Sequence, residues 1–131
     1  AYAKYKGIVT PVSTDRDNKL KPQTLTLYKL TTTTRRRITI TRELNELFAK
    51  LGASTKDKIE IDNGKKIYSK QMNGLSYFNV NIPIEAITEF LATVKKIDKT
   101  FEITKHEETT YNTKPIKDTN IEIWVHRKNV R

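Results

Sequence analysis

The chain of 131 residues has no cysteine, two histidines, four isolated glycines and no long apolar run. Without cysteine there is no disulfide, no thiolate nucleophile and no cysteine-ligated zinc, so packing alone must stabilise the fold. Isolated glycines do not form a glycine-rich phosphate-binding loop. The hydropathy pattern predicts no membrane-spanning helix, and the first residues lack the apolar segment of a signal peptide. We therefore expect a cytoplasmic protein that does not contact a membrane.

Few residues are suited to catalysis. His106 is expected in a polar loop and His126 in a basic tail, where both are ordinary surface residues. His106 has two glutamates beside it, but neighbouring residues on a strand point to opposite faces, and no second cluster completes a metal site. Glu43 and Glu85 fall at expected helix starts, where a carboxylate is stabilised by the helix dipole. The sequence therefore predicts no enzyme, no metal and no cofactor.

Positive charge is abundant and unevenly distributed. The formal net charge is +10, and residues 1–37 hold nine Lys or Arg against two Asp, a net of +7. Concentrated charge favours a polyanionic partner, because each neutralised phosphate releases counterions. The alternative is a lysine-rich surface that is merely solvated.

The spacing of apolar residues predicts two short helices. Leu44, Leu47 and Phe48 recur at intervals of three and four, with Thr41 as N-cap and Gly52 as the left-handed residue that ends the helix. The second helix is expected to begin with Pro83 at its first position and to run to about residue 96. The expected core comprises Ile38, Ile40, Leu44, Leu47, Phe48, Leu51, Ile59, Ile61, Val80, Ile82, Ile87, Phe90, Leu91, Phe101 and Ile103.

Alternation of apolar and polar residues predicts the strands. They are expected at residues 1–12, 23–30, 38–41, 58–61, 66–70, 75–82, 101–103 and 121–125. Asn63-Gly64 and Asn73-Gly74 are expected to form turns, because both residue types tolerate positive φ. The polar residues 13–22 are expected to be an exposed loop, and residues 104–120 a loop or a long hairpin.

A strand, a short helix and a second strand are thus expected between residues 37 and 61. Their segments are RITITREL at 37–44, Leu51-Gly52, and KDKIEI at 56–61. This stretch resembles the AbrB/MazE-type swapped-hairpin DNA-binding domain, although Thr41 replaces the usual proline and Lys56 the usual glycine. The resemblance implies a reader of duplex DNA whose arginines meet the DNA, and it leaves a homodimer possible.

An offset of 42 residues aligns residues 80–103 with residues 38–61. Five of the 24 aligned positions are identical, among them Phe48 and Phe90, and Pro83 aligns with Thr41. We expect one domain over residues 1–131 with this internal pseudo-repeat, the second family-like stretch being 79–103. The predicted fold is α+β, a β-rich compact barrel or sheet built from two βαβ units with two short helices outside. The alternative is a ferredoxin-like βαββαβ sheet.

Basic and aromatic residues therefore predict a small DNA-binding protein of phage or plasmid type, with duplex DNA slightly favoured. Arg35, Arg36, Arg37 and Arg42 would contact the backbone of a duplex. Single-stranded DNA is the alternative, since aromatic residues alternate with cations. Such runs surround Tyr5, Tyr28, Tyr68 and Trp124. The remaining candidate binding residues are Lys4, Lys6 and Lys29. A protein-interaction or inhibitor module is the third hypothesis.

Overall fold

The computed structural model describes residues 20–129, which divide into two compact units. The smaller unit includes residues 20–25 and 107–116, and the larger includes residues 26–106 and 117–129. The elements, in chain order, are β1 Lys21–Thr34, α1 Arg37–Leu51, β2 Glu60–Asp62, β3 Lys65–Ile67, β4 Lys70–Met72, β5 Leu75–Pro83, the 3-10 turn η1 Ile84–Ala86, α2 Ile87–Ile97, β6 Glu102–Asn112 and β7 Asp118–Arg127.

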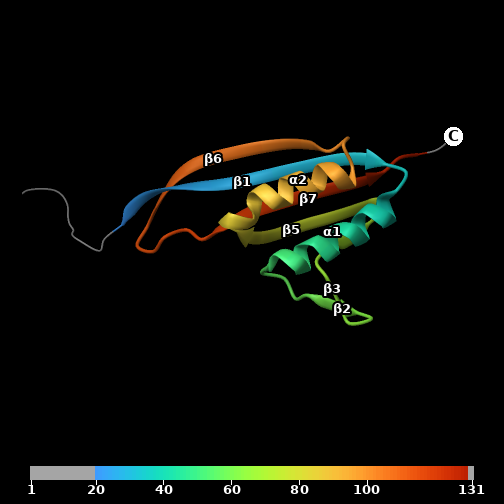
Figure 1. Ribbon diagram of the computed structural model, residues 1–131, viewed down its shortest axis with the longest axis horizontal. Coiled ribbons are helices and arrows are strands. Elements are labelled where there is room, and N and C mark those ends of the chain that lie inside the picture. Colours follow the sequence, from blue (N-terminus) through green and yellow to red (C-terminus); the bar gives the residue numbers. More distant parts are fainter. Residues whose placement is uncertain (1–19, 130–131) are drawn as a thin grey trace, which may run out of the picture. The chain divides into compact units, whose positions relative to one another are not determined.

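Five strands form one mixed sheet in the order β4-β5-β7-β1-β6 (Figure 1). β7 is parallel to β1 and antiparallel to β5, while β2 and β3 make a separate hairpin. The fold is therefore α+β as predicted, but the sheet is open and does not close into a barrel. If the β2–β3 hairpin and η1 are left out, the elements β1, α1, β4, β5, α2 and β6 follow one another in the chain as in the alternative βαββαβ prediction, but β7 is inserted between β5 and β1 in the sheet.

One face of the sheet carries the core, and we call it the covered face. Its residues are Tyr28, Leu30, Thr32, Ser76, Phe78, Val80, Ile82, Thr119, Ile121, Ile123 and Val125, and all of them are buried. Both helices pack on this face, in front of the strands in Figure 1. Phe48 of α1 joins the layers, because its ring lies 5.5 Å from that of Phe78 in the sheet and 5.4 Å from that of Phe90 in α2.

The strand predicted at residues 38–41 is wrong, because α1 already begins at Arg37. The threonines before it extend β1 instead, where Thr31 to Thr34 pair with Trp124 to Arg127 of β7. Thr41 is therefore not the N-cap: it is buried inside α1 and donates its hydroxyl to the carbonyl of Arg37 at 2.6 Å. Of the predicted core, Ile38 and Ile61 are 70% and 64% exposed: Ile38 is not among the buried residues of α1, and Ile61 lies in β2, all of whose residues are exposed.

Several local predictions are confirmed. Gly52 ends α1 with φ 76°, Asn63 and Gly64 both have positive φ in the β2–β3 turn, and residues 73–74 connect β4 to β5. Phe48 and Phe90 are fully buried as predicted. Pro83 ends β5 and precedes η1, so it is not the first residue of α2.

The segment predicted as a loop or long hairpin, 104–120, is mostly strand. β6 reaches Asn112 and β7 begins at Asp118, but β1 lies between the two strands, so they do not form a hairpin. The pseudo-repeat predicted from the 42-residue offset aligns segments of different secondary structure, since residues 37–40 are helical and residues 79–82 are extended. The strand predicted at residues 1–12, and the loop up to residue 19, lie outside the described residues.

Candidate nucleic-acid interface

The second face of the sheet, which we call the open face, has no helix packed on it within residues 20–129. Its residues alternate with those of the covered face and are exposed or half-buried. They are Leu27, Lys29, Thr31, Thr33, Lys70, Met72, Leu75, Tyr77, Asn79, Asn81, Asn120, Glu122, Trp124 and His126. Strand pairing arranges them in rows across the sheet, because directly opposite residues share a face.

Two aromatic rings occupy the middle of the open face. Tyr77 of β5 is directly opposite Trp124 of β7, and their ring centroids lie 5.5 Å apart at an interplanar angle of 52°. Lys70 is opposite Tyr77 on one side, and Thr31 is opposite Trp124 on the other. Tyr77 and Trp124, the aromatic pair, are thus half-buried rings with a lysine in the same row.

A carboxylate holds the tyrosine of the aromatic pair. The hydroxyl of Tyr77 donates to Oε2 of Glu122 at 2.6 Å, across neighbouring strands. Burial raises the pKa of Tyr77, and the hydrogen bond to Glu122 together with its charge raises that pKa further. The phenol therefore stays neutral over the physiological range, and its ring position is fixed by a charge-assisted hydrogen bond.

Three asparagines extend the open face beyond the aromatic pair. Nδ2 of Asn120 donates to Oδ1 of Asn79 at 2.8 Å, to Oδ1 of Asn81 at 3.1 Å and to the carbonyl oxygen of Val80 at 3.2 Å. Nδ2 of Asn79 in turn donates to the hydroxyl of Tyr77 at 3.4 Å. We call Asn79, Asn81 and Asn120 the amide cluster, and a hydrogen-bond chain connects it to the aromatic pair.

The amide cluster lines a cavity of about 310 Å³, whose other wall is the loop after α1. Ser54 of that loop exchanges two backbone hydrogen bonds with Asn81, at 2.9 and 2.8 Å, and the hydroxyl of Thr55 donates to the carbonyl of Asn79 at 3.1 Å. Lys56 and Asp57 complete the wall, and Asp57 forms an ion pair with Lys70 at 2.9 Å.

The predicted arginines lie where β1 leads into α1. Arg35 and Arg36 are exposed, and Arg36 lies 3.8 Å from Glu43. Arg37 is half-buried: its guanidinium donates to Oγ of Ser76 at 2.8 Å, and its buried Nε has no hydrogen-bond partner among residues 20–129. Arg37 therefore points into the protein and not toward a duplex backbone, which the sequence predicted it to contact.

The end of β7 adds charge beside these arginines. Thr34 is in register with Arg127, and the amide of Lys128 donates to the carbonyl of Thr34 at 2.8 Å. Arg35, Arg36, Arg127 and Lys128, which we call the basic end, are all exposed. The arginine run and the basic tail, which are far apart in the sequence, thus meet at one end of the sheet.

The other predicted binding residues are in different environments. Lys29 is exposed on the open face, in register with Glu122. Tyr28 is buried in the core at 8% exposure, and Tyr68 is likewise buried at 7%, so neither ring is available to a ligand. Lys4, Tyr5 and Lys6 lie outside the described residues.

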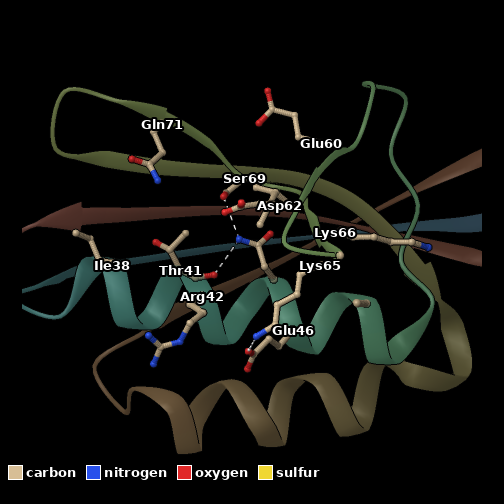
Figure 2. A pocket seen from close by; sticks show the side chains of 14 residues that line it. Ile38, Thr41, Arg42, Glu46, Glu60, Asp62, Lys65, Lys66, Ser69 and Gln71 are labelled. Carbon is tan, nitrogen blue, oxygen red and sulfur yellow. Dashed lines mark hydrogen bonds and ion pairs between the residues drawn. The ribbon is translucent and has the colours of Figure 1, made fainter.

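Arg42 is exposed on α1 and lines a different cavity of about 740 Å³ between that helix and the β2–β3 hairpin. Figure 2 shows Arg42, Lys65 and Lys66 around this cavity together with Glu46, Glu60 and Asp62. Lys65 forms an ion pair with Glu46 at 3.2 Å. Because cations and carboxylates are mixed, this cavity does not have the net positive character of a polyanion site.

Trp124 was a candidate from the sequence, whereas the amide cluster was not. The signal for the cluster was present in the alternation Asn79-Val80-Asn81-Ile82, which places two amides on the face opposite two core residues. Asn120 could be assigned to the same site only after β7 was known to pair with β5. Residues 20–129 contain no group of three or more acidic or histidine side chains suited to a metal ion.

None of the helices in this part of the chain is long and apolar enough to cross a membrane. Comparison with known proteins gives no further assignment: no protein-family model, no curated protein and no solved structure matches the chain.

Proposed function

We propose that this protein binds single-stranded nucleic acid on the open face of its sheet. The observation that carries the proposal is the aromatic pair, which lies on a face that none of the described helices covers. Bases of a single strand are unstacked and can stack on exposed aromatic rings, whereas a duplex keeps its bases stacked internally. Packing does not account for both rings, because the core lies on the other face.

The distribution of charge supports the same proposal. Lys29 and Lys70 flank the aromatic pair but lie beside the carboxylates Glu122 and Asp57, so the strongest positive charge is that of the exposed basic end at one end of the sheet. A single strand that crosses the open face would place its phosphates near these cations while its bases contact the rings. The net charge of +10 favours a polyanionic ligand over a neutral one.

Duplex DNA is the second candidate, and exposed Arg35 and Arg36 are the observation that favours it. The family resemblance of the sequence favours duplex DNA as well, and that resemblance stays a prediction. We place duplex DNA second because Arg37, one of the arginines predicted to contact a duplex, is half-buried and bonded to Ser76.

Trp124 provides a direct test, because it is the one tryptophan of the chain. Stacking of a base on the aromatic pair should quench its fluorescence, and binding should weaken steeply with added salt. Heparin, a polyanion without bases, should compete for the cations but should not quench Trp124 by stacking. If heparin and single strands change the fluorescence of Trp124 equally, the protein binds polyanions through its cations alone and base stacking plays no part. If neither ligand binds, a protein-interaction module becomes the better hypothesis.

Variants of the aromatic pair identify the binding face. Tyr77→Leu should weaken binding of a labelled single strand by about 1–3 kcal/mol, a factor of about 5 to 150, because one stacking surface is removed. Tyr111→Leu is the matched control, since Tyr111 is 60% exposed on β6 and is not one of the residues that define the open face. Equal weakening in the two variants, or equal weakening for single and duplex strands, would contradict the proposal.

The role of the basic end is tested separately. Replacing Arg35 and Arg36 together by glutamine should lower the slope of log K against log salt by about 0.7 for each phosphate of a single strand that these arginines neutralise. The free energy of unfolding should change by no more than about 0.5 kcal/mol, because both side chains are exposed. Lys96→Gln, an exposed lysine in the last turn of α2, is the control. An unchanged slope would mean that the basic end is only solvated.

A further inference from the structure

The amide cluster has hydrogen-bonding groups that residues 20–129 leave unused. Oδ1 of Asn79 and Oδ1 of Asn81 both accept from Nδ2 of Asn120, and the carbonyl of Val80 accepts from the same nitrogen. A backbone carbonyl can only accept, so the orientation of the Asn120 amide is fixed. The orientations of the Asn79 and Asn81 amides follow from it, because their oxygens must face that donor.

This arrangement determines which groups remain for a ligand. Within residues 20–129 no hydrogen bond engages Nδ2 of Asn81 or Oδ1 of Asn120, and Nδ2 of Asn79 uses one of its two hydrogens on the hydroxyl of Tyr77. The cluster therefore offers two amide donors and one amide acceptor. Its cavity of about 310 Å³ is adjacent to the aromatic pair, because Asn79 contacts Tyr77 directly.

We propose that the amide cluster is a nucleobase subsite that favours pyrimidines, which deepens the proposed function and rests on it. Thymine and uracil present two carbonyl acceptors and one N–H donor on the Watson–Crick edge, and cytosine presents two acceptors and one amino donor. Guanine presents two donors and one acceptor, and adenine one of each. In the number of donors and acceptors, pyrimidines therefore match the two donors and one acceptor of the cluster, and purines do not.

The wall of the cavity is held in place. Paired backbone hydrogen bonds attach Ser54 to Asn81, and the hydroxyl of Thr55 is bonded to the carbonyl of Asn79. A base that enters next to the aromatic pair thus meets amides whose positions are already set, so little ordering is needed on binding. The subsite would accept the base beside the one stacked on Tyr77 and Trp124.

Homopolymers of equal length, dT, dC and dA, test the subsite by competition against a labelled single strand. The wild-type protein should bind dT and dC about tenfold more tightly than dA, since matched base contacts discriminate by about 1–3 kcal/mol. Asn81→Asp retains the oxygen that accepts from Asn120 and removes the two amide hydrogens, so this preference should disappear. Asn73→Asp adds the same charge in the exposed β4–β5 turn, and the preference should persist there.

The outcomes separate the two proposals. A pyrimidine preference that survives in Asn81→Asp would overturn the subsite, because backbone flexibility of dT alone can favour such strands. Equal binding of all three homopolymers with quenching of Trp124 would also overturn the subsite and would leave the proposed function intact. Absence of binding to every homopolymer would overturn both. Thermal unfolding of Asn81→Asp and Asn73→Asp should occur at similar temperatures, which would show that a change in preference does not come from unfolding.

Discussion

The covered face and the open face of the sheet are built from alternate residues of the same strands, β1, β5 and β7. On the covered face, Phe78, Val80 and Ile123 are fully buried beneath the two helices. On the open face, Tyr77 and Trp124 contact one another and stay half-buried. The difference shows that burial in the core explains the apolar residues of one face but not the aromatic residues of the other, and this difference is the basis of the proposed binding face.

Polar residues on the two faces differ in how fully their hydrogen-bonding groups are paired within the protein. On the covered face, Oγ of Ser76 is bonded to Thr41 and Arg37, and the hydroxyl of Thr32 is bonded to Thr100. On the open face, the amide cluster retains donors and an acceptor that no described residue engages. Buried polar groups must be paired for stability, whereas exposed groups can be kept for a ligand.

The largest expected difference between the faces is in the cost of removing an aromatic ring. Phe48→Ala should lower the free energy of unfolding by about 3–5 kcal/mol, because Phe48 is fully buried against Phe78 and Phe90. Trp124→Ala should cost less than Phe48→Ala, because it loses about 0.5–1.5 kcal/mol from the aromatic pair and the burial of only part of its side chain. Urea unfolding followed by circular dichroism measures both. Equal costs would mean that Trp124 is a structural residue and not a binding residue.

An intermediate loss in the free energy of unfolding is expected when Ser76, a buried polar residue of the covered face, is replaced. Ser76→Ala should cost about 1–3 kcal/mol, because the buried hydroxyl of Thr41 and the guanidinium of Arg37 are both left without this partner. Ser54→Ala is the control: Ser54 is exposed and bridges to Asn81 through its backbone, so a change of no more than about 0.5 kcal/mol is expected. Chemical denaturation of the two variants under one condition compares them, and a neutral Ser76→Ala would show that the network is dispensable.

The smallest loss in the free energy of unfolding is expected when Asp98 is replaced. Its carboxylate accepts hydrogen bonds from the hydroxyls of Thr32 and Thr100. Burial raises the pKa of Asp98, but hydrogen bonds from Thr100 and Thr32 and the charge of Arg36 outweigh burial and hold that pKa below its usual range. Its contribution to stability is therefore present above the ordinary pKa of about 3.9 and is lost as the pH falls below it.

Asp98→Asn should accordingly cost about 1 kcal/mol at neutral pH, since the carboxylate accepts charge-assisted hydrogen bonds that an amide replaces only in part. The cost should shrink as the pH falls through about 4, the ordinary pKa of the carboxyl group. Unfolding of the variant and the wild type between neutral and acidic pH measures this difference. A cost that does not depend on pH would show that the ionisation of Asp98 is irrelevant to stability.

Local sequence determined much of the secondary structure. The three- and four-residue spacing of Leu44, Leu47 and Phe48 correctly predicted the body of α1, and alternation correctly predicted β5 from Leu75 onward. The turns at Gly52 and Gly64 were also predictable, because their positive φ is a property of the residue. All of these features could be predicted because the spacing, the alternation and the glycines that indicate them involve residues close together in the chain.

Tertiary structure decided what local sequence could not. Residues 38–41 alternate like a strand but are helical, because β1 uses the threonines before them to pair with β7, and Ile40 is then buried with the rest of α1. The insertion of β7 between β5 and β1 places Trp124 beside Tyr77 and Asn120 beside Asn81. The sequence by itself therefore determined which residues share a face of each strand. Only the order of the strands, a non-local choice made by burial of the whole core, determined which residues meet on the open face.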